Sequence, residues 1–565
     1  MKFISLLHRQ HAASATLPPG DAKSRFHLSA GGLVVAVSIW LASVGNIPLW
    51  MALWRLPEVS ALHGTLFVFA FFLFVAALLV AFLSLFAWRW TLKPAIAFCL
   101  MAAALGANFM LDYGIVIDKS MMVNVMQTDV RESVELLSLQ LFIVLGVMAA
   151  LPIWLLLRTE VGHLPLFSRV KRNLTLVVLA VLVALSVVML CFQDMASVMR
   201  NHKQIRYMIN PLNSIYALGS LAAEPFAHPK MPAVQIGRDA RLGASWEKQG
   251  KPRLLVLVVG ETARAANFSL NGYGRDTNPE LASENVVSFL NVYSCGTSTA
   301  ASLPCMFSHL GHEDFDERQA DYESLPDVLA HAGLNVVWRD NNSGCKGICA
   351  NIAAEDMSHL HDPRFCSDRE CLDEILLQGL DATLARLQSE KQAKGVVVIL
   401  HQKGSHGPAY HLRSPKEYKR YLPECETNTL QSCSREQVVN AYDNTIRYTD
   451  HFLAQTLRWL KERSESYDTA MLYVSDHGES LGENNTYLHG LPYMIAPDVQ
   501  KHVPMIVWIS PAMEQRTGIT TECLSGLRER ALTHDYLFHS VLGLMDVQAA
   551  EYRPEQNVFQ QCSSI

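Results

Sequence analysis

Long apolar runs are absent from this 565-residue sequence after Gln193, and charged residues are scarce throughout. Only 18% of the residues are charged, whereas 50% are hydrophobic. The net charge of -6 lacks the basic excess typical of proteins that bind nucleic acid, so no nucleic-acid partner is expected. Internal repeats and low-complexity tracts are also lacking, so a repeat architecture is not expected.

The apolar residues that are present concentrate before Gln193. Five stretches are long enough to cross about 30 Å of hydrocarbon, which takes roughly 20 helical residues. They cover residues 31–54, 64–88, 95–110, 139–157 and 174–192. The first stretch follows a long mixed segment and is too long for the core of a signal peptide, so we expect it to stay as an anchor.

Lys and Arg are distributed unevenly among the loops between these stretches. They are frequent in the N-terminal arm, the second loop and the fourth loop: Lys2, Arg9, Lys23 and Arg25; Arg89 and Lys93; Arg158, Arg169, Lys171 and Arg172. Such loops face the cytoplasm. With five crossings, the chain after Phe192 lies on the other side, which predicts a multi-pass membrane protein whose soluble half lies outside the cytoplasm.

Cysteine is absent before Cys99, and ten of the twelve cysteines lie between Cys295 and Cys562. Eight form close pairs in the sequence: Cys295 with Cys305, Cys345 with Cys349, Cys366 with Cys371, and Cys425 with Cys433. The spacings lack the repeated two-residue gap of a zinc ribbon, so local disulfides in an oxidising compartment are favoured. Cys523 and Cys562 could pair or remain free.

The sequence divides into a five-helix transmembrane domain at 1–193, a linker with short membrane-surface helices at 194–250 and an α/β domain at 251–565. The linker is interrupted by proline and either lies at the membrane surface or is solvated. Apolar runs at 254–259, 334–338, 396–400, 470–474 and 505–509 indicate strands, and patterns at 372–387 and 446–460 indicate helices. This rhythm predicts a mainly parallel sheet.

Polar residues follow three of these strands directly. Glu261 and Thr262 follow the first, His401 follows the third, and Asp476 and His477 follow the fourth. Ligands bind at the carboxyl ends of strands in such sheets, and carboxylate and imidazole groups suit zinc. The sequence therefore predicts a metal site at this edge.

A nucleophile beside the metal is available in the segment from Cys295 to Cys305. It contains four hydroxyls: Thr297, Ser298, Thr299 and Ser302. A hydroxyl bound to zinc loses its proton more readily, and the cation also neutralises a phosphoryl oxygen. Composition alone does not choose among the four hydroxyls.

Four motifs give the sequence a resemblance to a known family. They are Gly260-Glu261-Thr262, the Cys295 to Cys305 loop, Gly404-Ser405-His406-Gly407-Pro408, and the ten residues from Ser475 to Asn484. With the five-helix anchor, they resemble the phosphoethanolamine transferases that modify lipid A, including the mobile colistin-resistance enzymes. The resemblance covers nearly the whole chain.

This resemblance implies an alkaline phosphatase-like, or sulfatase-like, catalytic domain with one tight zinc site formed by Glu261, Thr299, Asp476 and His477. Thr299 matches the nucleophile that takes phosphoethanolamine from phosphatidylethanolamine, releases diacylglycerol and passes the group to a lipid A phosphate. The modification lowers the negative charge of the envelope and so implies polymyxin resistance. The resemblance also implies a multi-pass protein of the bacterial inner membrane with its catalytic domain in the periplasm, and we expect a monomer.

Further positions match residues of the family that contact substrate or a second zinc ion. They are Asn342, Lys346, His406 and His489, and, in the third membrane loop, Asn124, Thr128 and Glu132. The last three recur every four residues and would share one face of a helix. Glu132 could pair with the ethanolamine ammonium.

Three alternatives remain open. The acceptor could be a lipopolysaccharide core sugar, a periplasmic glucan or a glycolipid. The chain could instead be a membrane-tethered phosphatase or sulfatase, although a soluble substrate would need neither the anchor nor the third-loop residues. A transporter is disfavoured because the apolar helices contain few ionisable residues to line a pathway.

Overall fold

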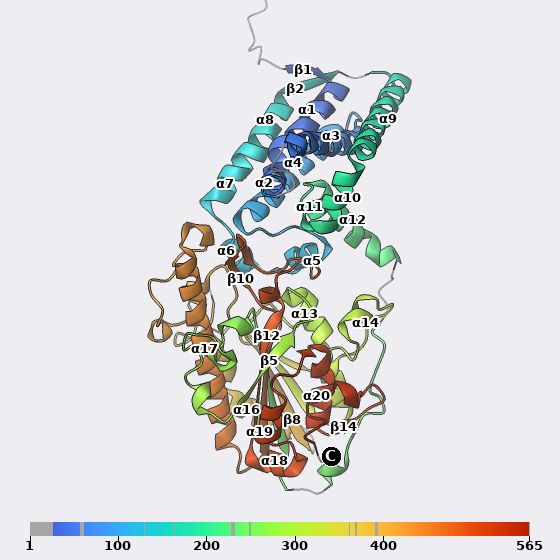
Figure 1. The fold of residues 1–565 in the computed structure, drawn as a ribbon. Coiled ribbons are helices and arrows are strands. Elements are labelled where there is room, and N and C mark those ends of the chain that lie inside the picture. The colour runs from blue at the N-terminus through green and yellow to red at the C-terminus, as the bar shows by residue number, and fades with distance from the viewer. Residues whose placement is uncertain are drawn as a thin grey trace, which may run out of the picture.

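The structure is a computed structural model that describes residues 26–56, 62–128, 130–162, 164–227, 232–247, 250–360, 362–367, 370–389 and 394–563. The apolar helices and the α/β domain are stacked end to end, and the short helices α5 (Lys119–Gln127) and α6 (Val130–Glu135) lie between them (Figure 1). The C-terminal end of the chain lies on the side of the α/β domain away from the apolar helices.

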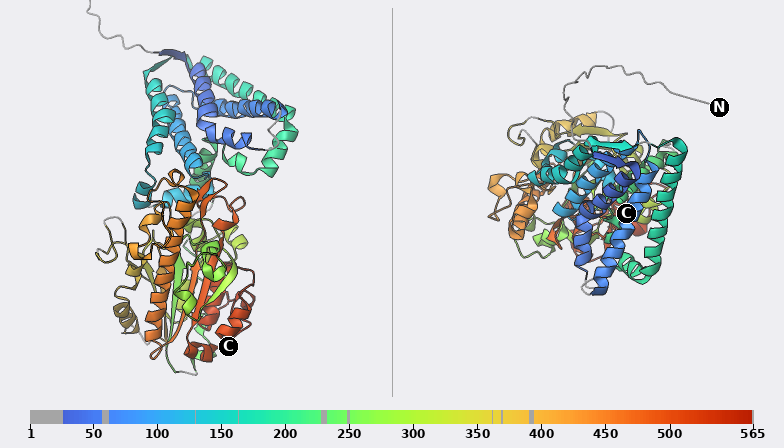
Figure 2. Two further views of the ribbon diagram at one scale, coloured as in Figure 1. Left: turned by 60° about the vertical axis from the view of Figure 1, so that its left-hand side comes forward. Right: turned by 90° about the horizontal axis from the view of Figure 1, so that it is seen from above.

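Five spans long and apolar enough to cross a membrane confirm the predicted number: Ala30–Trp54, Gly64–Leu85, Leu92–Asp112, Leu139–Arg158 and Leu166–Leu190. They are built from α1 (Ala30–Ser43), α2 (Ile47–Trp54), α3 (Leu62–Leu85), α4 (Leu92–Asp112), α7 (Leu139–Leu145), α8 (Leu151–Arg158) and α9 (Leu166–Leu190). The third and fifth helices are longer than expected, because their polar first turns continue the helix beyond the apolar run. Figure 2 shows the bundle from two further sides.

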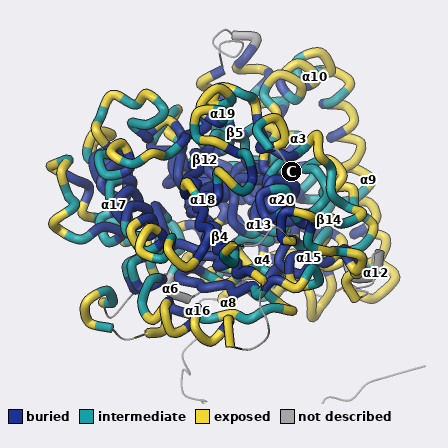
Figure 3. Tube along the Cα trace, turned by 90° about the horizontal axis from the view of Figure 1, so that it is seen from below, coloured by how far each residue is buried: buried dark blue, intermediate teal, exposed yellow. Residues whose placement is uncertain are grey.

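The outer faces of these helices expose large apolar side chains. Leu179 and Leu182 of α9, for example, are each 54% exposed, and α9 is mostly exposed in Figure 3. A surface on which so many large apolar side chains are exposed is suited to contact with lipid and not with water. Lys2, Arg9, Lys23 and Arg25, which contributed to the predicted orientation, lie outside the described residues.

The segment after the fifth span is helical over much of its length up to Ala227. It contains α10 (Phe192–Asn201), α11 (Gln204–Tyr207) and α12 (Leu212–Ala227), so Pro225 does not end the last helix. The side-chain amide of Asn210 donates to the carbonyls of Gly45 and Ala103. The segment therefore packs against the membrane helices, and the boundaries at 193 and 250 remain predictions.

The α/β domain contains an eight-stranded sheet with the order β13-β5-β12-β9-β4-β8-β6-β7. Its strands are β4 (Arg253–Gly260), β5 (Val287–Tyr293), β6 (Asn335–Asp340), β7 (Ala353–Asp356), β8 (Gly395–His401), β9 (Asp468–Ser475), β12 (His502–Ile509) and β13 (Leu532–Thr533). All five predicted strands are present, whereas β5, β7 and β13 were not predicted. The sheet is mainly parallel, but β12 runs antiparallel to both β5 and β9.

Alternate residues of β4 enter two different cores. Leu255, Leu257 and Val259 pack in one apolar cluster, and Leu254, Val256 and Val258 pack in another. The strand is buried on both faces, which explains its uninterrupted apolar sequence.

Helices cover both faces of the sheet. The predicted helix at 446–460 is the second half of α17 (Arg435–Glu462). The predicted helix at 372–387 is confirmed only in its second half: a short 3-10 helix at Asp373–Leu377 precedes α16 (Leu380–Ser389), and Gly379 between them has φ +69°. Backbone in this left-handed region ends the turn and cannot continue a helix.

Candidate active site

Three parallel strands bring the predicted polar residues to one edge of the sheet. Val259 of β4 is in register with His401 of β8, and Gly260 is in register with Ser475 of β9. Glu261, His401 and Asp476 therefore lie at the same edge of the sheet, as the positions of the strand ends predicted. Each is at most 1% exposed.

Glu261, Asp476 and His477 form a compact buried cluster that could hold a metal ion. Nε2 of His477 lies 3.3 Å from Oε1 of Glu261 and 3.4 Å from Oδ2 of Asp476. This Oδ2 atom is buried and accepts no hydrogen bond from the described residues. Burial and the neighbouring Glu261 carboxylate raise the pKa of Asp476. Two buried carboxylates beside the same histidine nitrogen can both stay ionised only if a cation lies between them; otherwise one of them takes up a proton.

The other ring nitrogen of His477 fixes the orientation of the imidazole. Nδ1 lies 2.9 Å from the carbonyl oxygen of Gly478. A carbonyl only accepts hydrogen bonds, so Nδ1 carries a proton and Nε2 faces the two carboxylates. Burial lowers the pKa of His477, but the Asp476 and Glu261 carboxylates outweigh this effect and raise it. A histidine held in this way is ready to bind a metal ion.

Thr299 is the first residue of α13 (Thr299–Met306) and is 6% exposed. Its hydroxyl donates to Oε2 of Glu261 at 3.0 Å and lies 3.4 Å from Nε2 of His477. The hydroxyls of Thr297 and Ser302 instead donate to the carbonyls of Leu491 and Asp476. Thus Thr299 has the hydroxyl that joins the carboxylate and imidazole cluster.

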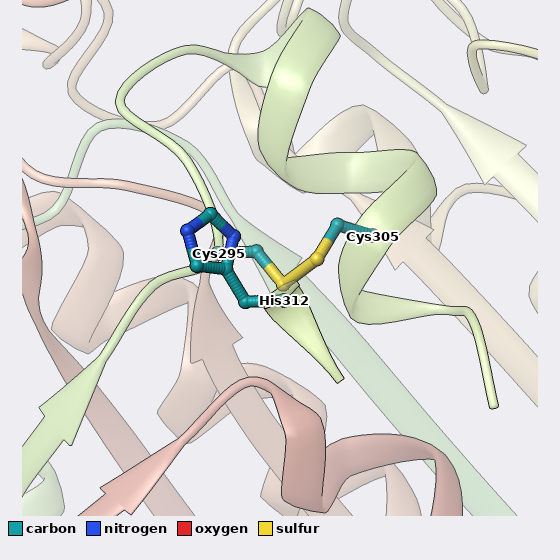
Figure 4. Close-up of side chains that lie close together, drawn as sticks. All are labelled: Cys295, Cys305 and His312. Atoms are coloured by element: carbon teal, nitrogen blue, oxygen red, sulfur yellow. A yellow bond between two sulfur atoms is a disulfide. The ribbon is translucent and has the colours of Figure 1, made fainter. Parts of the chain in front are cut away.

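Cys295 and Cys305 form a disulfide that ties the segment before α13 to the last turn of this helix. His312 lies beside this disulfide (Figure 4). Because the two sulfur atoms are bonded to each other, neither is a thiolate available to a metal ion. The group is therefore a structural brace for the Thr299 segment.

Asn342 and Lys346 lie in the loop after β6, and Asp340 orders this loop. Oδ1 of Asp340 accepts hydrogen bonds from the backbone of Asn342 and Gly344, and its Oδ2 lies 2.9 Å from Nδ1 of His401. The Asn342 amide donates to Oε2 of Glu261 at 2.6 Å. Asn342 therefore contacts the cluster directly. His401 lies outside the cluster, 3.3 Å from the Asn342 amide.

The Lys346 side chain lies at a cavity beside Thr299. Its ammonium donates to the carbonyl and hydroxyl oxygens of Ser343, both at 3.0 Å. The adjacent disulfide between Cys345 and Cys349 is present as predicted.

His406 and His489 line the same cavity and contact each other edge to face, with ring centroids 5.4 Å apart. Nδ1 of His489 lies 2.8 Å from Oε2 of Glu479, and the Tyr410 hydroxyl donates to the other oxygen of Glu479. Burial lowers the pKa of both histidines. Glu479 and Tyr410 orient His489, a role that their place in the sequence did not reveal.

One cavity of about 300 Å³ connects Thr299 with the third membrane loop. Asn124, Thr128 and Glu132 all line it, but they do not share one helix as predicted. The backbone of Thr128 is extended, with ψ 132°, and separates α5 from α6. The three side chains therefore line one cavity, but they come from two short helices and the extended residue between them.

Glu132 is paired with Lys403, a residue not singled out from the sequence. The Lys403 ammonium lies 2.8 Å from Oε1 of Glu132. Burial would raise the pKa of Glu132, but Lys403 and His406 outweigh this effect and lower it to about 2. Asp373 holds the Lys403 loop by accepting hydrogen bonds from the backbone of Lys403 and Gly404. In the sequence, the only signal for a role of Lys403 is its position shortly after a predicted strand.

The remaining predicted disulfides, Cys366 with Cys371 and Cys425 with Cys433, are also present. Cys523 and Cys562, whose pairing the spacing left open, form a fifth disulfide. All ten cysteines of the α/β domain are therefore paired.

Together, the anchor, the sheet and the buried hydroxyl cluster define a membrane-anchored enzyme of the alkaline phosphatase and sulfatase class. Residues 253–547 match the sulfatase family, and residues 74–226 match the family described as phosphoethanolamine transferase EptA/EptB. Phosphoethanolamine transferase EptA of Escherichia coli K12 is 38% identical over 529 residues, covering 92% of this chain and 94% of that protein. Phosphatidylethanolamine transferase Mcr-1 of Escherichia coli is 38% identical, covering 92% of this chain and 95% of that protein.

The integral membrane protein lipooligosaccharide phosphoethanolamine transferase A (EptA) of Neisseria meningitidis has a similar solved structure. The TM-score is 0.91 at 35% identity, covering 95% of this chain and 99% of that chain. The chain belongs to the phosphoethanolamine transferase family. It is an inner-membrane protein with five transmembrane helices, and its catalytic domain lies in the periplasm.

Proposed function

We propose that the chain transfers phosphoethanolamine from phosphatidylethanolamine to a phosphate of lipid A through a covalent intermediate on Thr299, and that it acts as a monomer. The names of its relatives refer to phosphatidylethanolamine and to lipooligosaccharide. The added group carries an ammonium, so the reaction lowers the negative charge of the envelope and weakens the binding of cationic polymyxins.

The observation that carries this proposal is the cavity between Thr299 and the membrane. Its catalytic end contains polar groups, including Thr299, Lys346 and His406. Its other end is lined by Leu105 and Phe109 of α4, together with other apolar side chains. A phospholipid has the same order of polar head group and apolar tail, whereas a soluble phosphate ester or sulfate ester lacks the apolar part.

The cluster around His477 fits a zinc ion. In a tetrahedral zinc site with bonds of about 2.0–2.2 Å, ligand atoms lie about 3.3–3.6 Å apart. Nε2 of His477 lies 3.3 Å, 3.4 Å and 3.4 Å from oxygens of Glu261, Asp476 and Thr299. Glu261, Thr299, Asp476 and His477 would therefore hold the ion. Bound zinc would lower the pKa of the threonine hydroxyl and neutralise charge on a phosphoryl oxygen.

In the first step, Oγ1 of Thr299 attacks the phosphorus of phosphatidylethanolamine. A Thr299 oxygen–phosphorus bond forms, and the bond between phosphorus and the glycerol oxygen breaks. The Thr299 hydroxyl gives its proton to Glu261, which accepts its hydrogen bond. Diacylglycerol leaves with one proton, which His406 or His489 is placed to relay, because a neutral imidazole passes on a proton only after accepting one. Lys346 is placed to bind a phosphoryl oxygen, and Asn342 holds Glu261 in position.

In the second step, a phosphate oxygen of lipid A attacks the same phosphorus from the side opposite Thr299. The bond to Thr299 breaks, and its hydroxyl recovers a proton. Both steps are in-line displacements, so positioning and neutralisation of charge supply most of the acceleration. The ethanolamine ammonium is assigned to Glu132.

Mass spectrometry of lipid A and core oligosaccharide, from cells with and without the protein, tests the acceptor. We expect phosphoethanolamine on lipid A only in cells that contain the protein. Its appearance only on core sugars would overturn the acceptor. Release of free phosphoethanolamine without any modified glycolipid would identify a phosphatase instead.

A further inference from the structure

A second cavity, about 710 Å³ in volume, lies at the end of the membrane domain away from the α/β domain. The short strands β1 (Phe26–Ser29) and β2 (Thr159–Gly162) mark this end in Figure 1. They pair in parallel and join the segment before α1 to the segment after α8. Residues of β2 line the cavity, so part of its wall is regular secondary structure.

Five cations from separate segments converge on this cavity: Arg89, Lys93, Arg158, Arg169 and Arg172. Among the described residues, Glu160 is the one carboxylate that lines it, and His27 lies 3.4 Å from that carboxylate. Like charges brought together repel one another unless an anion lies between them. The balance of charge therefore indicates an anionic ligand.

The cations are held in place by neutral groups. Lys93 donates to the carbonyl of Thr159 at 2.8 Å, and Arg169 donates to that of Leu164 at 2.8 Å. The Arg158 guanidinium lies over the ring of Trp154, 4.1 Å from its centroid. Nε of Arg172 is buried and has no hydrogen-bond acceptor among the described residues. This orphaned donor is a second, independent sign of a missing acceptor.

Aromatic and apolar groups accompany the charges. Trp90 lines the cavity, is 79% exposed and lies beside Arg89, whose guanidinium is 5.0 Å from the centroid of its ring. Tryptophan is enriched at the level of lipid head groups, and basic pockets between helices on the cytoplasmic side bind anionic head groups. Basic residues in cytoplasmic loops also orient a membrane protein, but that role does not require their side chains to line one cavity.

We propose that this cavity binds the phosphate-bearing head group of an anionic phospholipid from the cytoplasmic leaflet. A zwitterionic head group would place its own ammonium among five cations and is therefore disfavoured. Free phosphate would satisfy the cations but leave the tryptophans and Leu157 without an apolar partner. The site lies at the opposite end of the membrane domain from the cavity beside Thr299 and does not depend on the proposed reaction.

Native mass spectrometry of the purified full chain tests this site, with phosphatidylglycerol and phosphatidylethanolamine added at equal concentration. We expect the wild type to retain phosphatidylglycerol in preference to phosphatidylethanolamine, and an excess of inorganic phosphate to displace little of it. The double variant Arg158→Gln/Arg172→Gln should lose affinity for phosphatidylglycerol by about fivefold for each cation removed. Lys171→Gln is the matched control, because Lys171 is exposed and does not line the cavity.

Equal retention of the two lipids by the wild type would overturn the proposal, and so would full displacement by inorganic phosphate. An equal loss in Lys171→Gln and in the double variant would reduce the effect to general surface charge. The wild-type competition needs no variant, so it decides the matter even if the double variant fails to fold. Formation of all five disulfides in the double variant would show that its catalytic domain still reaches the periplasm.

Discussion

The ammonium of Lys403 lies 2.8 Å from Oε1 of Glu132, and this ion pair joins the loop after β8 to α6. Both side chains are only 12% exposed, and Nε2 of His406 lies 3.8 Å from the same carboxylate oxygen. The pKa of about 2 keeps Glu132 ionised at physiological pH. Glu132, the carboxylate assigned to the ethanolamine ammonium of the donor lipid, is thus already paired with Lys403. The donor ammonium must therefore displace the Lys403 ammonium when it binds.

Lys403→Met should lower the KM for phosphatidylethanolamine, because the donor ammonium no longer competes with a resident cation. We expect a change of roughly tenfold, the size of a charge-assisted hydrogen bond worth about 1.5 kcal/mol. Glu132→Gln should raise KM instead. Assays on mixed micelles measure both variants, with the exposed Lys394→Met as control. A higher KM in Lys403→Met would show that the lysine assists donor binding.

Thr299→Ala should abolish release of diacylglycerol from a fluorescent phosphatidylethanolamine, because it removes the hydroxyl that contacts both Glu261 and His477. Thr299→Ser keeps a hydroxyl and should retain partial activity. Mass spectrometry of the trapped protein should find phosphoethanolamine on the Thr299 peptide. Unchanged diacylglycerol release by the purified alanine variant would disprove the proposed nucleophile.

Removing metal with a chelator should stop the reaction, and zinc should restore it. The physical reason is the buried pair of carboxylates, which needs a cation to stay ionised together. Elemental analysis should find zinc in the wild type and much less in His477→Ala, whereas a variant of the exposed Lys394 should keep it. Recovery of activity with magnesium alone would contradict a zinc site.

Arg413 provides a second link between the catalytic domain and α6. Its side chain is 2% exposed, pairs with Glu135 at 2.8 Å and also pairs with Glu370. Arg413→Met leaves two partly buried carboxylates without their cation, which should cost about 3 kcal/mol. Hydrogen exchange of α6 should become faster. Arg413→Lys should restore part of the protection, and unchanged exchange in both variants would show that the ion pairs do not hold the loop.

The disulfide between Cys523 and Cys562 closes a sequence separation of 39 residues. Its loss should destabilise the catalytic domain by about 4 kcal/mol through the greater entropy of the unfolded chain. Replacing both cysteines by serine should lower the midpoint of denaturant unfolding and leave zinc content unchanged, because neither residue lies at the cluster. An identical midpoint would indicate that the unfolded chain is already constrained.

Much of the fold follows from apolar patterning alone. Length and hydropathy identified all five spans, and continuous apolar runs identified β4, β8 and β9, because strands buried on both faces leave no polar positions. The edge strands β7 and β13 were missed, since short strands with one partner carry little apolar signal. The helix predicted at 372–387 failed at Gly379, whose positive φ outweighed the apolar spacing on either side.

The sequence by itself determined the two solvents of the chain, the pairing of eight cysteines and the strand ends that carry Glu261, Asp476 and His477. These features depend on local runs and short spacings, which a linear pattern records. Only the tertiary structure decided that the Thr299 hydroxyl meets this cluster, that Lys403 pairs with Glu132 and that Cys523 bonds to Cys562. Each of these contacts joins residues at least 38 positions apart, and their meeting depends on strand order and on the docking of α6.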